Sequence, residues 1–406
     1  MMKKALLVLV LILSASVLFA QGATDDGLYR GIVDQPIEPA TVNRTDKLNY
    51  SLYYNASKLA EKGLVIQVPY IESSSYNVST ALKDKGFAEA LSNITKLKIS
   101  RADLVAYLMG LVMATGSGYN NIISADTVLG AQVGHMGFGL IAKADMQSMP
   151  PIVNGEIGHS TSPAGNGYVP ELNFAFTFAY GRRIIENDLF TMDVGGAVRY
   201  AQKVYLNQIT LSTLSDILDK KVQIDTLAAR GGFAIPVDLG VTMGFLDGRL
   251  EVFATANNIN GYYYMWNYDG YKDALLFKNG YDSFVMYTPF SLGLGVSYDP
   301  KFRYVDPSIS FAFGGINLYM QNDLSKEHAF LELFKYIDAN IYVDILDILN
   351  VRASYRNGYP QFGLGFDVYG NMVELSYGFH EAGEEYGLRP VDALTIRVKL
   401  GYEKKR

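Results

Sequence analysis

The chain contains 406 residues with 35 basic and 41 acidic side chains, which give a formal net charge of −6. This acidic balance argues against nucleic acid as a partner. The chain has no cysteine, which excludes disulfide bonds and thiolate metal ligands as sources of stability.

The first 20 residues have the pattern of a cleavable secretory signal. Lys3 and Lys4 precede an apolar run at 5–19, and the small residues Ala20 and Gly22 follow. We expect cleavage after Ala20, with cleavage after Gly22 as the alternative. The run is too short for a typical membrane-spanning helix, and no later apolar run is long enough for one. We therefore expect an exported chain without a helical membrane anchor.

Residues 77–117 carry two predicted helices that interrupt a pattern of strands. The first helix is expected at about 81–98. The second, 104–114, follows Ser100 and Asp103, a pair that caps helix N-termini. Two interpretations of this second helix stay open: it exposes an apolar patch to ligand or membrane, or it packs over the mouth of the domain. Its apolar side chains include Leu104, Leu108, Leu111 and Val112.

Most of the remaining chain alternates bulky apolar residues with small or polar ones, as residues 172–181 show. Because successive side chains of a strand point to opposite faces, each segment has one apolar face and one small, polar face. The second face carries few charges, unlike the solvent face of a β-sandwich. Segments of about ten residues with this pattern are typical of a transmembrane β-barrel. The apolar parity in this example consists of Leu172, Phe174, Phe176, Phe178 and Tyr180.

The number and spacing of these segments predict the architecture. Their connections alternate between short and long, as in barrels of the outer membrane of bacteria with two membranes. We therefore predict an all-β, antiparallel barrel of about 14 strands over residues 63–402, followed by a tail at 403–406. Its partners would be the lipid bilayer and the machinery that assembles outer-membrane proteins. The predicted strands are 63–70, 122–134, 135–146, 170–181, 188–206, 232–245, 249–260, 289–299, 307–319, 336–346, 349–357, 361–369, 371–380 and 393–402.

Two places on this path do not fit a plain strand. Pro236 lies in the clearest alternating segment, where a proline removes one hydrogen bond of the ladder. It marks either a bulge in the wall or the end of a strand. The tyrosine-rich segment 261–288 is predicted to be a long loop. Its aromatic residues are expected to anchor at the membrane interface, and stacking against a ligand is the alternative.

Several charged residues share the parity of the inner face of the predicted barrel. Arg352, Arg356 and Arg397 are the basic residues that we select as candidates for binding a carboxylate head group, since arginine binds carboxylates bidentately. The alternative interpretation is a network of salt bridges that fills the barrel. Other members of this set are Asp193, Arg199, Asp238, Arg249, Glu251, Glu374 and Lys399.

Three groups of residues together resemble the FadL-like family of outer-membrane transporters for hydrophobic compounds, which includes TraF-like and PorV-like relatives. The first group, Asn55, Ala56 and Leu59, is similar to the family's Asn-Pro-Ala-x-x-Leu hatch motif, with Ala56 in place of the proline. The second comprises 237–241 and 256–259, and the third lies within 351–377. The resemblance covers about residues 45–402.

The resemblance implies a fourteen-stranded barrel closed from below by an N-terminal hatch, here the polar segment 21–62. A hydrophobic ligand would bind an extracellular apolar groove, pass into the barrel and leave sideways through a gap in the wall.

The predicted function is therefore passive transport of hydrophobic small molecules, such as long-chain fatty acids, without a cofactor. Two alternatives remain: a general porin for polar solutes, and a PorV-like structural or secretion-associated barrel. An enzyme is not expected, because the sequence has neither a Gly-x-Ser-x-Gly elbow nor a His-Glu-x-x-His metal motif. With four histidines and no cysteine, a transition-metal site is not expected either.

Overall fold

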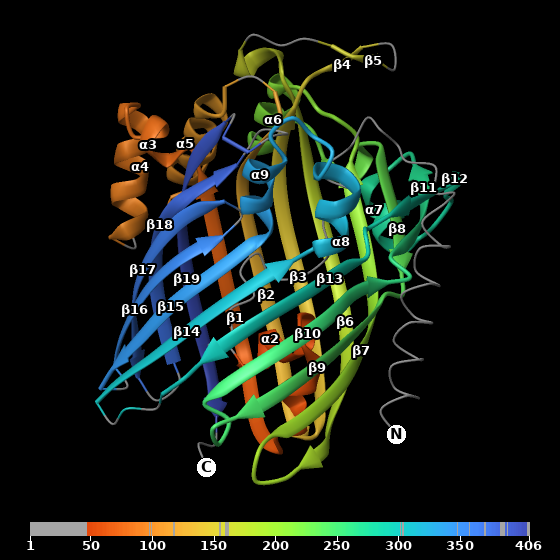
Figure 1. Ribbon diagram of the computed structural model, residues 1–406. Helices are drawn as coiled ribbons and strands as arrows, with labels where there is room; N and C mark the ends of the chain where they lie inside the picture. Colours follow the sequence, from red (N-terminus) through yellow and green to blue (C-terminus); the bar gives the residue numbers. More distant parts are fainter. Residues whose placement is uncertain are drawn as a thin grey trace.

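The alternating segments form antiparallel strands that close into one barrel, shown in Figure 1 for the computed structural model. The structure describes residues 47–403, apart from 97, 99, 117, 154–155, 159–161, 301, 303, 347, 357, 369–370, 382–385 and 388. The predicted signal peptide, the first part of the predicted hatch and the last three residues lie outside the described residues.

The main sheet contains 17 strands, but three pairs of them are successive halves of one longer strand. Each pair continues across a break of a few residues: β8 with β9, β10 with β11, and β12 with β13. Counting each pair once, the barrel wall has fourteen strands, and we call each of them a stave. The strands are β1 (Gly63–Tyr76), β2 (Asn120–Gly134), β3 (Met136–Met149), β6 (Gly167–Glu186), β7 (Thr191–Leu206), β8 (Ala229–Ala234), β9 (Val237–Phe245), β10 (Leu250–Ile259), β11 (Tyr262–Tyr268), β12 (Tyr281–Tyr287), β13 (Ser291–Tyr298), β14 (Val305–Gly314), β15 (Ile337–Ile345), β16 (Leu349–Arg356), β17 (Tyr359–Val368), β18 (Asn371–Glu381) and β19 (Pro390–Glu403).

The first and last strands close the barrel. β1 pairs antiparallel with β19, from Val65 opposite Glu403 to Tyr76 opposite Ala393, and its other edge pairs with β2. Closure satisfies the backbone groups of both edges, which is a condition for placing a sheet in lipid. The prediction of a fourteen-stranded antiparallel barrel is therefore confirmed.

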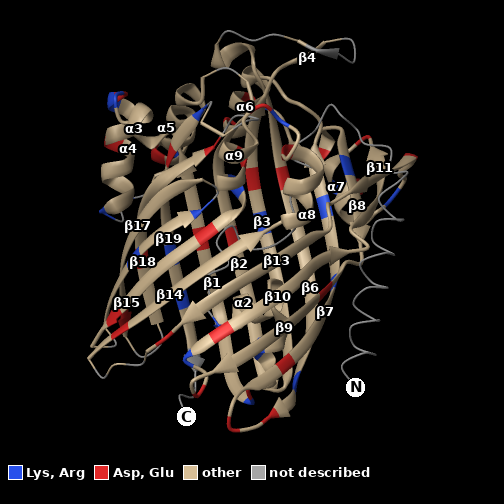
Figure 2. Cartoon of the chain, viewed as in Figure 1, with Lys and Arg blue, Asp and Glu red and all other residues tan. Residues whose placement is uncertain are grey.

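The two faces of each stave follow the predicted alternation. On β6, Phe176 leaves 53% of its surface exposed on the outside, whereas the neighbouring Thr177 is fully buried inside. The outer wall therefore presents apolar side chains, and Figure 2 shows most of the ribbon between the two ends without charge. These are the properties of a wall that faces lipid.

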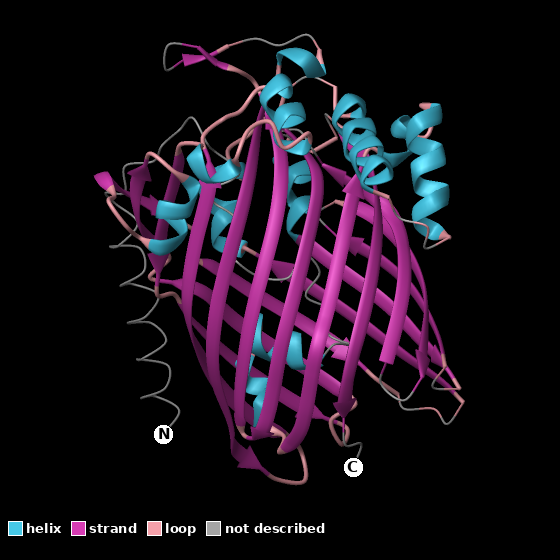
Figure 3. Cartoon of the chain, turned by 180° about the vertical axis from the view of Figure 1, so that it is seen from behind, coloured by secondary structure: helices cyan, strands magenta, loops and turns pink. Residues whose placement is uncertain are grey.

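The two ends of the barrel differ. One end has short turns, such as the single residue between β2 and β3, and the other carries long connections and most of the helices (Figure 3). A two-stranded ribbon, β4 (Ile152–Val153) with β5 (Glu156–Ile157), also lies in these long connections. No helix among the described residues is long and apolar enough to cross a membrane. The helices of the long connections are α3 (Val78–Ala81), α4 (Lys85–Thr95), α5 (Arg101–Ala114), η3 (Pro163–Gly165), α6 (Leu211–Leu218), η4 (Ile224–Thr226), α7 (Tyr271–Leu276), α8 (Ile316–Leu318), η5 (Tyr319–Asp323), α9 (Ala329–Glu332) and η6 (Leu333–Tyr336).

The predicted long loop at 261–288 is wrong. This segment contains β11, the short helix α7 and β12, which extend two staves toward the long-loop end. Tyrosine has high strand propensity, and pairing of β11 with β8 outweighs the preference of these residues for the interface. The predicted strand 232–245 is also divided, because it breaks at Ile235 and Pro236. The first strand is longer than predicted and continues to Tyr76.

Candidate functional site

The N-terminal part of the described chain lies inside the lower half of the barrel, where Figures 1 and 3 show two short helices enclosed by the wall. These are α2 (Lys47–Tyr53) and the 3-10 helix η2 (Ala56–Ala60). We call residues 47–60 the lumen segment. Leu52, Tyr53 and Leu59 are fully buried by the wall around them. The lumen segment occupies the barrel at the end with short turns.

Glycines on the inner wall make room for the lumen segment. A Cβ atom on Gly195 would lie 2.3 Å from the carbonyl oxygen of Ala56, and one on Gly240 would lie 2.1 Å from Oδ1 of Asn55. Both distances are far below van der Waals contact, so any larger residue would displace the segment. The same close approach, between 2.6 and 2.8 Å, occurs at Gly137, Gly139 and Gly181. We call these five glycines the glycine seat.

The candidate motif residues fix the lumen segment to this seat. Asn55 caps η2, since its Oδ1 accepts hydrogen bonds from the backbone N of Ser57 at 3.2 Å and from the Ser57 hydroxyl at 2.6 Å. Its Nδ2 donates to Oγ1 of Thr242 on β9 at 3.0 Å, and Ser57 lies 2.7 Å from the same oxygen. Ala56 and Leu59 pack against the glycine seat. The structure therefore brings Asn55, Ala56 and Leu59 together at one contact with the wall.

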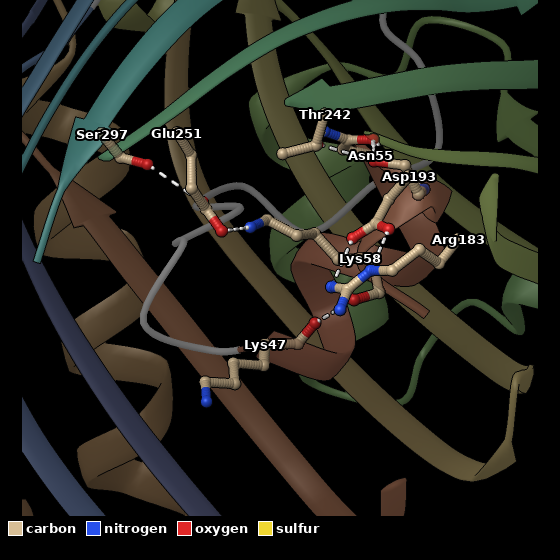
Figure 4. Close-up of polar contacts among 10 residues, drawn as sticks. Lys47, Asn55, Lys58, Arg183, Asp193, Thr242, Glu251 and Ser297 are labelled. Atoms are coloured by element: carbon tan, nitrogen blue, oxygen red, sulfur yellow. Dashed lines mark hydrogen bonds and ion pairs between the residues drawn. The ribbon is translucent and has the colours of Figure 1, made fainter. Parts of the chain in front are cut away.

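An ion pair joins the lumen segment to the wall beside this contact, as Figure 4 shows. Lys58 donates to Oε1 of Glu251 on β10, whose other oxygen accepts from Ser297 at 3.2 Å. Below it, Arg183 binds Asp193 through Nε at 2.8 Å and Nη2 at 3.2 Å. Both pairs are partly buried, but only Lys58–Glu251 ties the lumen segment to the wall, since Arg183 and Asp193 join the wall strands β6 and β7.

Above the lumen segment, charged and polar side chains cross the inner wall as one continuous row of register partners. Arg397 is its best-satisfied member: Nε donates to Glu72 at 2.8 Å, and Nη1 donates to Glu374 and to Ser376. We call this row the charged rung. Its members, one from each of seven neighbouring strands, are Glu374, Arg397, Glu72, Asp126, Lys143, Asn173 and Lys203.

The three candidate head-group arginines occupy different positions relative to this rung. Arg397 is engaged by carboxylates on both sides. Arg352 lies 3.7 Å from Glu374, and its Nε and Nη1 have no hydrogen-bond partner although the side chain is buried. Arg356 is 3.9 Å from Asp338. The structure thus brings Arg352 and Arg397 to one carboxylate, while Arg356 lies farther along β16. Arg249, which the sequence placed on the inner face, is instead exposed in the turn between β9 and β10.

Unsatisfied polar atoms collect along the inner face of β16. Asn350 and Ser354 flank Arg352 at two-residue spacing, so all three point into the lumen. The amide group of Asn350 and the hydroxyl of Ser354 also lack hydrogen-bond partners. Buried polar atoms without partners are costly, and they occur where a protein holds a ligand or ordered water. We call these three residues the β16 strip.

The inner wall beside Lys203, the last member of the charged rung, is mostly apolar, and the Lys203 ammonium lies 5.6 Å from the centre of the Tyr263 ring. Met265 on β11 and Met286 on β12 are fully buried, and Tyr263 beside them is almost so. They belong to one cluster that continues down to Leu52 and Tyr53 of the lumen segment and up to Met149 and Val169 near the long loops. We call the part on β7, β8, β11 and β12 the lumen cluster: Ala201, Tyr205, Ala234, Tyr263, Met265 and Met286.

The wall is interrupted where the lumen cluster ends. The breaks at 235–236, 260–261 and 288–290 lie next to one another in three neighbouring staves. Pro236 has no N–H to donate, so the ladder between β8 and β11 is interrupted here before pairing resumes between β9 and β10, while the Pro236 carbonyl accepts from the backbone N of Arg199 on β7 at 3.0 Å. One side-chain bond crosses the gap, from Nδ2 of Asn260 to the carbonyl of Ile235 at 3.3 Å. We call this region the wall interruption. Pro236 thus lies between two strands, directly before the first residue of β9, which agrees with the strand-end interpretation.

A buried ion pair supports the interruption from the inside. Nη2 of Arg199 donates to Asp238 at 2.9 Å and to Asn258 at 2.6 Å, and Asn258 donates its backbone N–H to Asp238 at 2.8 Å. All three side chains are buried. They join β7, β9 and β10 where backbone pairing is weakest.

Aromatic side chains surround the interruption on the outside. Phe233 lies at the centre, with its ring 5.8 Å from Tyr200, 6.1 Å from Trp266 and 6.0 Å from Phe277. Tyr264, 6.2 Å from Phe233, leaves 54% of its surface exposed. Amphipathic aromatic rings of this kind favour the boundary between lipid and water.

The candidate apolar residues of α5 do not lie together. Leu111 and Val112 are fully buried against the upper barrel wall, Leu108 is half-buried, and Leu104 is 52% exposed. The predicted cap is present, because Ser100 and Asp103 bond each other's backbone N–H groups.

In the part of the chain that the structure describes, no group of three or more metal-binding side chains comes together.

The geometry defines a class: a closed outer-membrane-type β-barrel whose lumen is occupied by its own N-terminal segment. No family model matches the sequence, and no match was found among curated proteins. Among solved structures, the chain is similar to the Pseudomonas putida toluene transporter TodX, with a TM-score of 0.39 and 11% identity over 88% of this chain and 93% of TodX. It is also similar to a Pseudomonas aeruginosa FadL homologue, with a TM-score of 0.36 and 9% identity over 94% of this chain and 98% of that chain. The translocator domain of the autotransporter NalP from Neisseria meningitidis gives a TM-score of 0.34 and 10% identity over 88% of this chain and 93% of that chain.

Replacing Gly195 with valine should displace the lumen segment, because the new side chain would occupy the position of the Ala56 carbonyl. We expect the frequency of open-channel events in planar bilayers to rise several-fold. Gly196→Val is the matched control, since a Cβ there would lie 3.3 Å from the side chain of Leu239 and 3.6 Å from the carbonyl oxygen of Asp238 and would not approach the lumen segment. If both variants conduct like the parent, the glycine seat does not hold the barrel closed.

Proposed function

We propose that this chain is a FadL-like outer-membrane transporter that carries hydrophobic small molecules without a cofactor. The observation that carries this proposal is the lumen cluster, a group of buried apolar side chains on the inner wall beside the charged rung. An apolar solute binds such a surface by the hydrophobic effect, at about 25 cal/mol per Å² of apolar area removed from water. The lumen segment is held inside the barrel, and this arrangement supports the proposal of a closed transporter more than that of an open porin.

The proposed route enters at the long-loop end near Met149 and follows the lumen cluster toward Tyr263. Straight passage is opposed by the lumen segment and by the charged rung, where an apolar solute would have to separate paired charges. The wall interruption lies beside the lower end of the lumen cluster and offers a sideways exit. A solute leaving there would pass directly into the apolar membrane core.

Long-chain fatty acids are the first ligands to test, because the β16 strip offers donors to a carboxylate. Arg352 has two unpartnered buried nitrogen atoms, and Asn350 adds an unpartnered amide. Within this proposal Arg397 is a positioning residue, since its bonds to Glu72 and Glu374 leave Arg352 as the arginine that binds the head group. Arg356, which has one unpartnered buried nitrogen, would extend the site along β16.

Reconstitution of the purified chain separates the candidate functions. We expect protein-dependent uptake of a fluorescent fatty acid into liposomes, with little steady ion conductance in planar bilayers. A large steady conductance would contradict the closed transporter and favour the porin. Neither uptake nor conductance would favour a PorV-like structural or secretion-associated role.

Arg352→Gln should reduce fatty-acid uptake about tenfold or more at limiting concentration, because charge-assisted hydrogen bonds contribute roughly 1.5–3 kcal/mol each. Uptake of the corresponding methyl ester should not change. Arg249→Gln, in an exposed turn, is the control. Equal loss for the acid and the ester would show that the variant damages the barrel and that the residue does not recognise the head group.

A covalent bridge across the wall interruption should block the sideways exit. The chain has no cysteine, so Ile235→Cys with Asn260→Cys provides a unique pair that oxidation or a short bis-maleimide can join. We expect uptake to fall at least tenfold in the bridged protein and to return when a disulfide bridge is reduced. Val241→Cys with Ala254→Cys, register partners on β9 and β10, should have no effect. Unchanged uptake in the bridged protein would place the exit elsewhere.

A further inference from the structure

Polar side chains point into the barrel directly above the lumen segment, and the first of them lies on β9. Thr242 accepts a hydrogen bond from Asn55, and Gly240 lies against the same asparagine. Figure 4 shows Asn55 beside Thr242 at this contact. Successive inward residues of a strand are two positions apart, so Asp238 is the next inward residue toward the long loops.

The neighbouring strand β10 carries two further polar residues at the same height. The ring of Phe253 lies 6.4 Å from that of Tyr50 and 6.2 Å from that of Tyr54, so this parity of β10 faces the lumen segment. Thr255 and Asn257 are the next two residues of this parity. Their side chains are buried, with 4% and 7% of their surface exposed.

A bulge in β10 brings these inward residues of the two strands together. The register between β9 and β10 shifts between Ala256 and Ile259, and Asn258 adopts a left-handed φ of 59°. The backbone N of Asn258 then donates to Oδ1 of Asp238 at 2.8 Å. The peptide group that follows Asn257 is thus bonded to the Asp238 carboxylate, which places the two side chains next to each other.

Three oxygen atoms at this place have no hydrogen-bond partner among the described residues. Oδ1 of Asp238 also accepts from Arg199, but Oδ2 of the same carboxylate has no partner. Oδ1 of Asn257 and the hydroxyl of Thr255 are in the same state. Buried oxygen atoms without a partner are costly. Because carboxylate and amide oxygens only accept hydrogen bonds, the group that completes this site is a donor.

The lower end of the lumen cluster adjoins these acceptors. Ala201 lies two residues above Arg199 on β7, and its register partner on β8 is Ala234. Tyr263 and Met265 lie on β11, which continues the stave of β10 beyond the wall interruption. A ligand with its apolar body against the lumen cluster would therefore place its end group at the acceptors. Apolar walls with a few well-placed polar groups are typical of small-molecule sites.

We propose that this place is a hydroxyl-binding site, which selects alcohols among the apolar compounds that enter the barrel. One hydroxyl donates to Oδ2 of Asp238, and a second on the adjacent carbon atom donates to Oδ1 of Asn257. The best-matched class is therefore an apolar chain that ends in a vicinal diol. An ammonium group does not match, because Arg199 already balances the charge of Asp238 and a further buried cation would be unpaired. This site rests on the proposed function for the entry of apolar compounds into the lumen.

The test compares three compounds that share an octyl chain: 1,2-octanediol, 1-octanol and octyl methyl ether. Their affinities for the full chain, purified in an amphipathic polymer, are measured by calorimetry. We expect affinity to rise about fivefold from ether to alcohol and about fivefold again from alcohol to diol, since each step adds one buried hydrogen bond. Binding does not require transport, so failure of uptake and failure of this site are separate results.

Asn257→Leu should remove only the second of these two steps, because the acceptor for one of the two hydroxyls is lost. The diol should then bind like the alcohol, while the alcohol keeps its preference over the ether through Asp238. Asn257→Ala provides the same comparison if leucine prevents folding. Asn340→Leu is the matched control, because Oδ1 of this inward asparagine is also unpartnered but lies on β15. The control should change neither step.

Equal affinities for the alcohol and the diol in the parent, or a diol preference that survives in both Asn257 variants, would contradict this inference. An equal loss for all three compounds would also contradict it, because the residue would then only shape the wall. Tighter binding of octylammonium than of the diol would identify a cation site instead. Absence of uptake together with diol binding that depends on Asn257 would overturn the transport proposal and support this site.

Discussion

The contact between the lumen segment and the glycine seat is the constraint on which the arrangement of the barrel depends. A fourteen-stranded barrel is too wide for its own inward side chains to fill it. Here backbone approaches backbone, because a side chain larger than hydrogen at Gly195 or Gly240 would collide with Ala56 or Asn55. Close backbone approach leaves little room for sliding, so the polar bonds of Asn55 and Ser57 to Thr242 fix the segment in one register.

Above the lumen segment, the inner wall of the barrel has a charged part and an apolar part. β18, β19, β1, β2, β3, β6 and β7 contribute the charged rung, in which Arg397 bonds to both Glu72 and Glu374. β7, β8, β11 and β12 contribute the lumen cluster, so the two groups meet on β7. The wall is interrupted beside Pro236, where the breaks of three neighbouring strands adjoin, whereas on the charged side β1 shows a register shift between Gln67 and Tyr70 without being divided.

Sequence periodicity predicted the class, the fourteen strands and the capped helix α5, because each depends on local patterns with a period of 2 or 3.6 residues. It failed at 261–288, where pairing of β11 with β8 decides the outcome and tyrosine is equally suited to a strand and an interface. The inward glycines were visible in the sequence, but their function was not. The partners of Gly195 and Gly240 lie more than 130 residues away, in the lumen segment. The lumen cluster was missed for a similar reason, since Met265 and Met286 lie within the segment predicted to be a loop.

The aromatic group around Phe233 has a practical meaning for work on this protein. Trp266 is the one tryptophan in the sequence, and it lies in the outer ring group beside the wall interruption. Indole emission responds to the polarity around the ring, so the intrinsic fluorescence of Trp266 reports on the environment beside the wall interruption in the unmodified chain. Its spectrum reports on local separation of the strands without any engineered label, and no second tryptophan adds background.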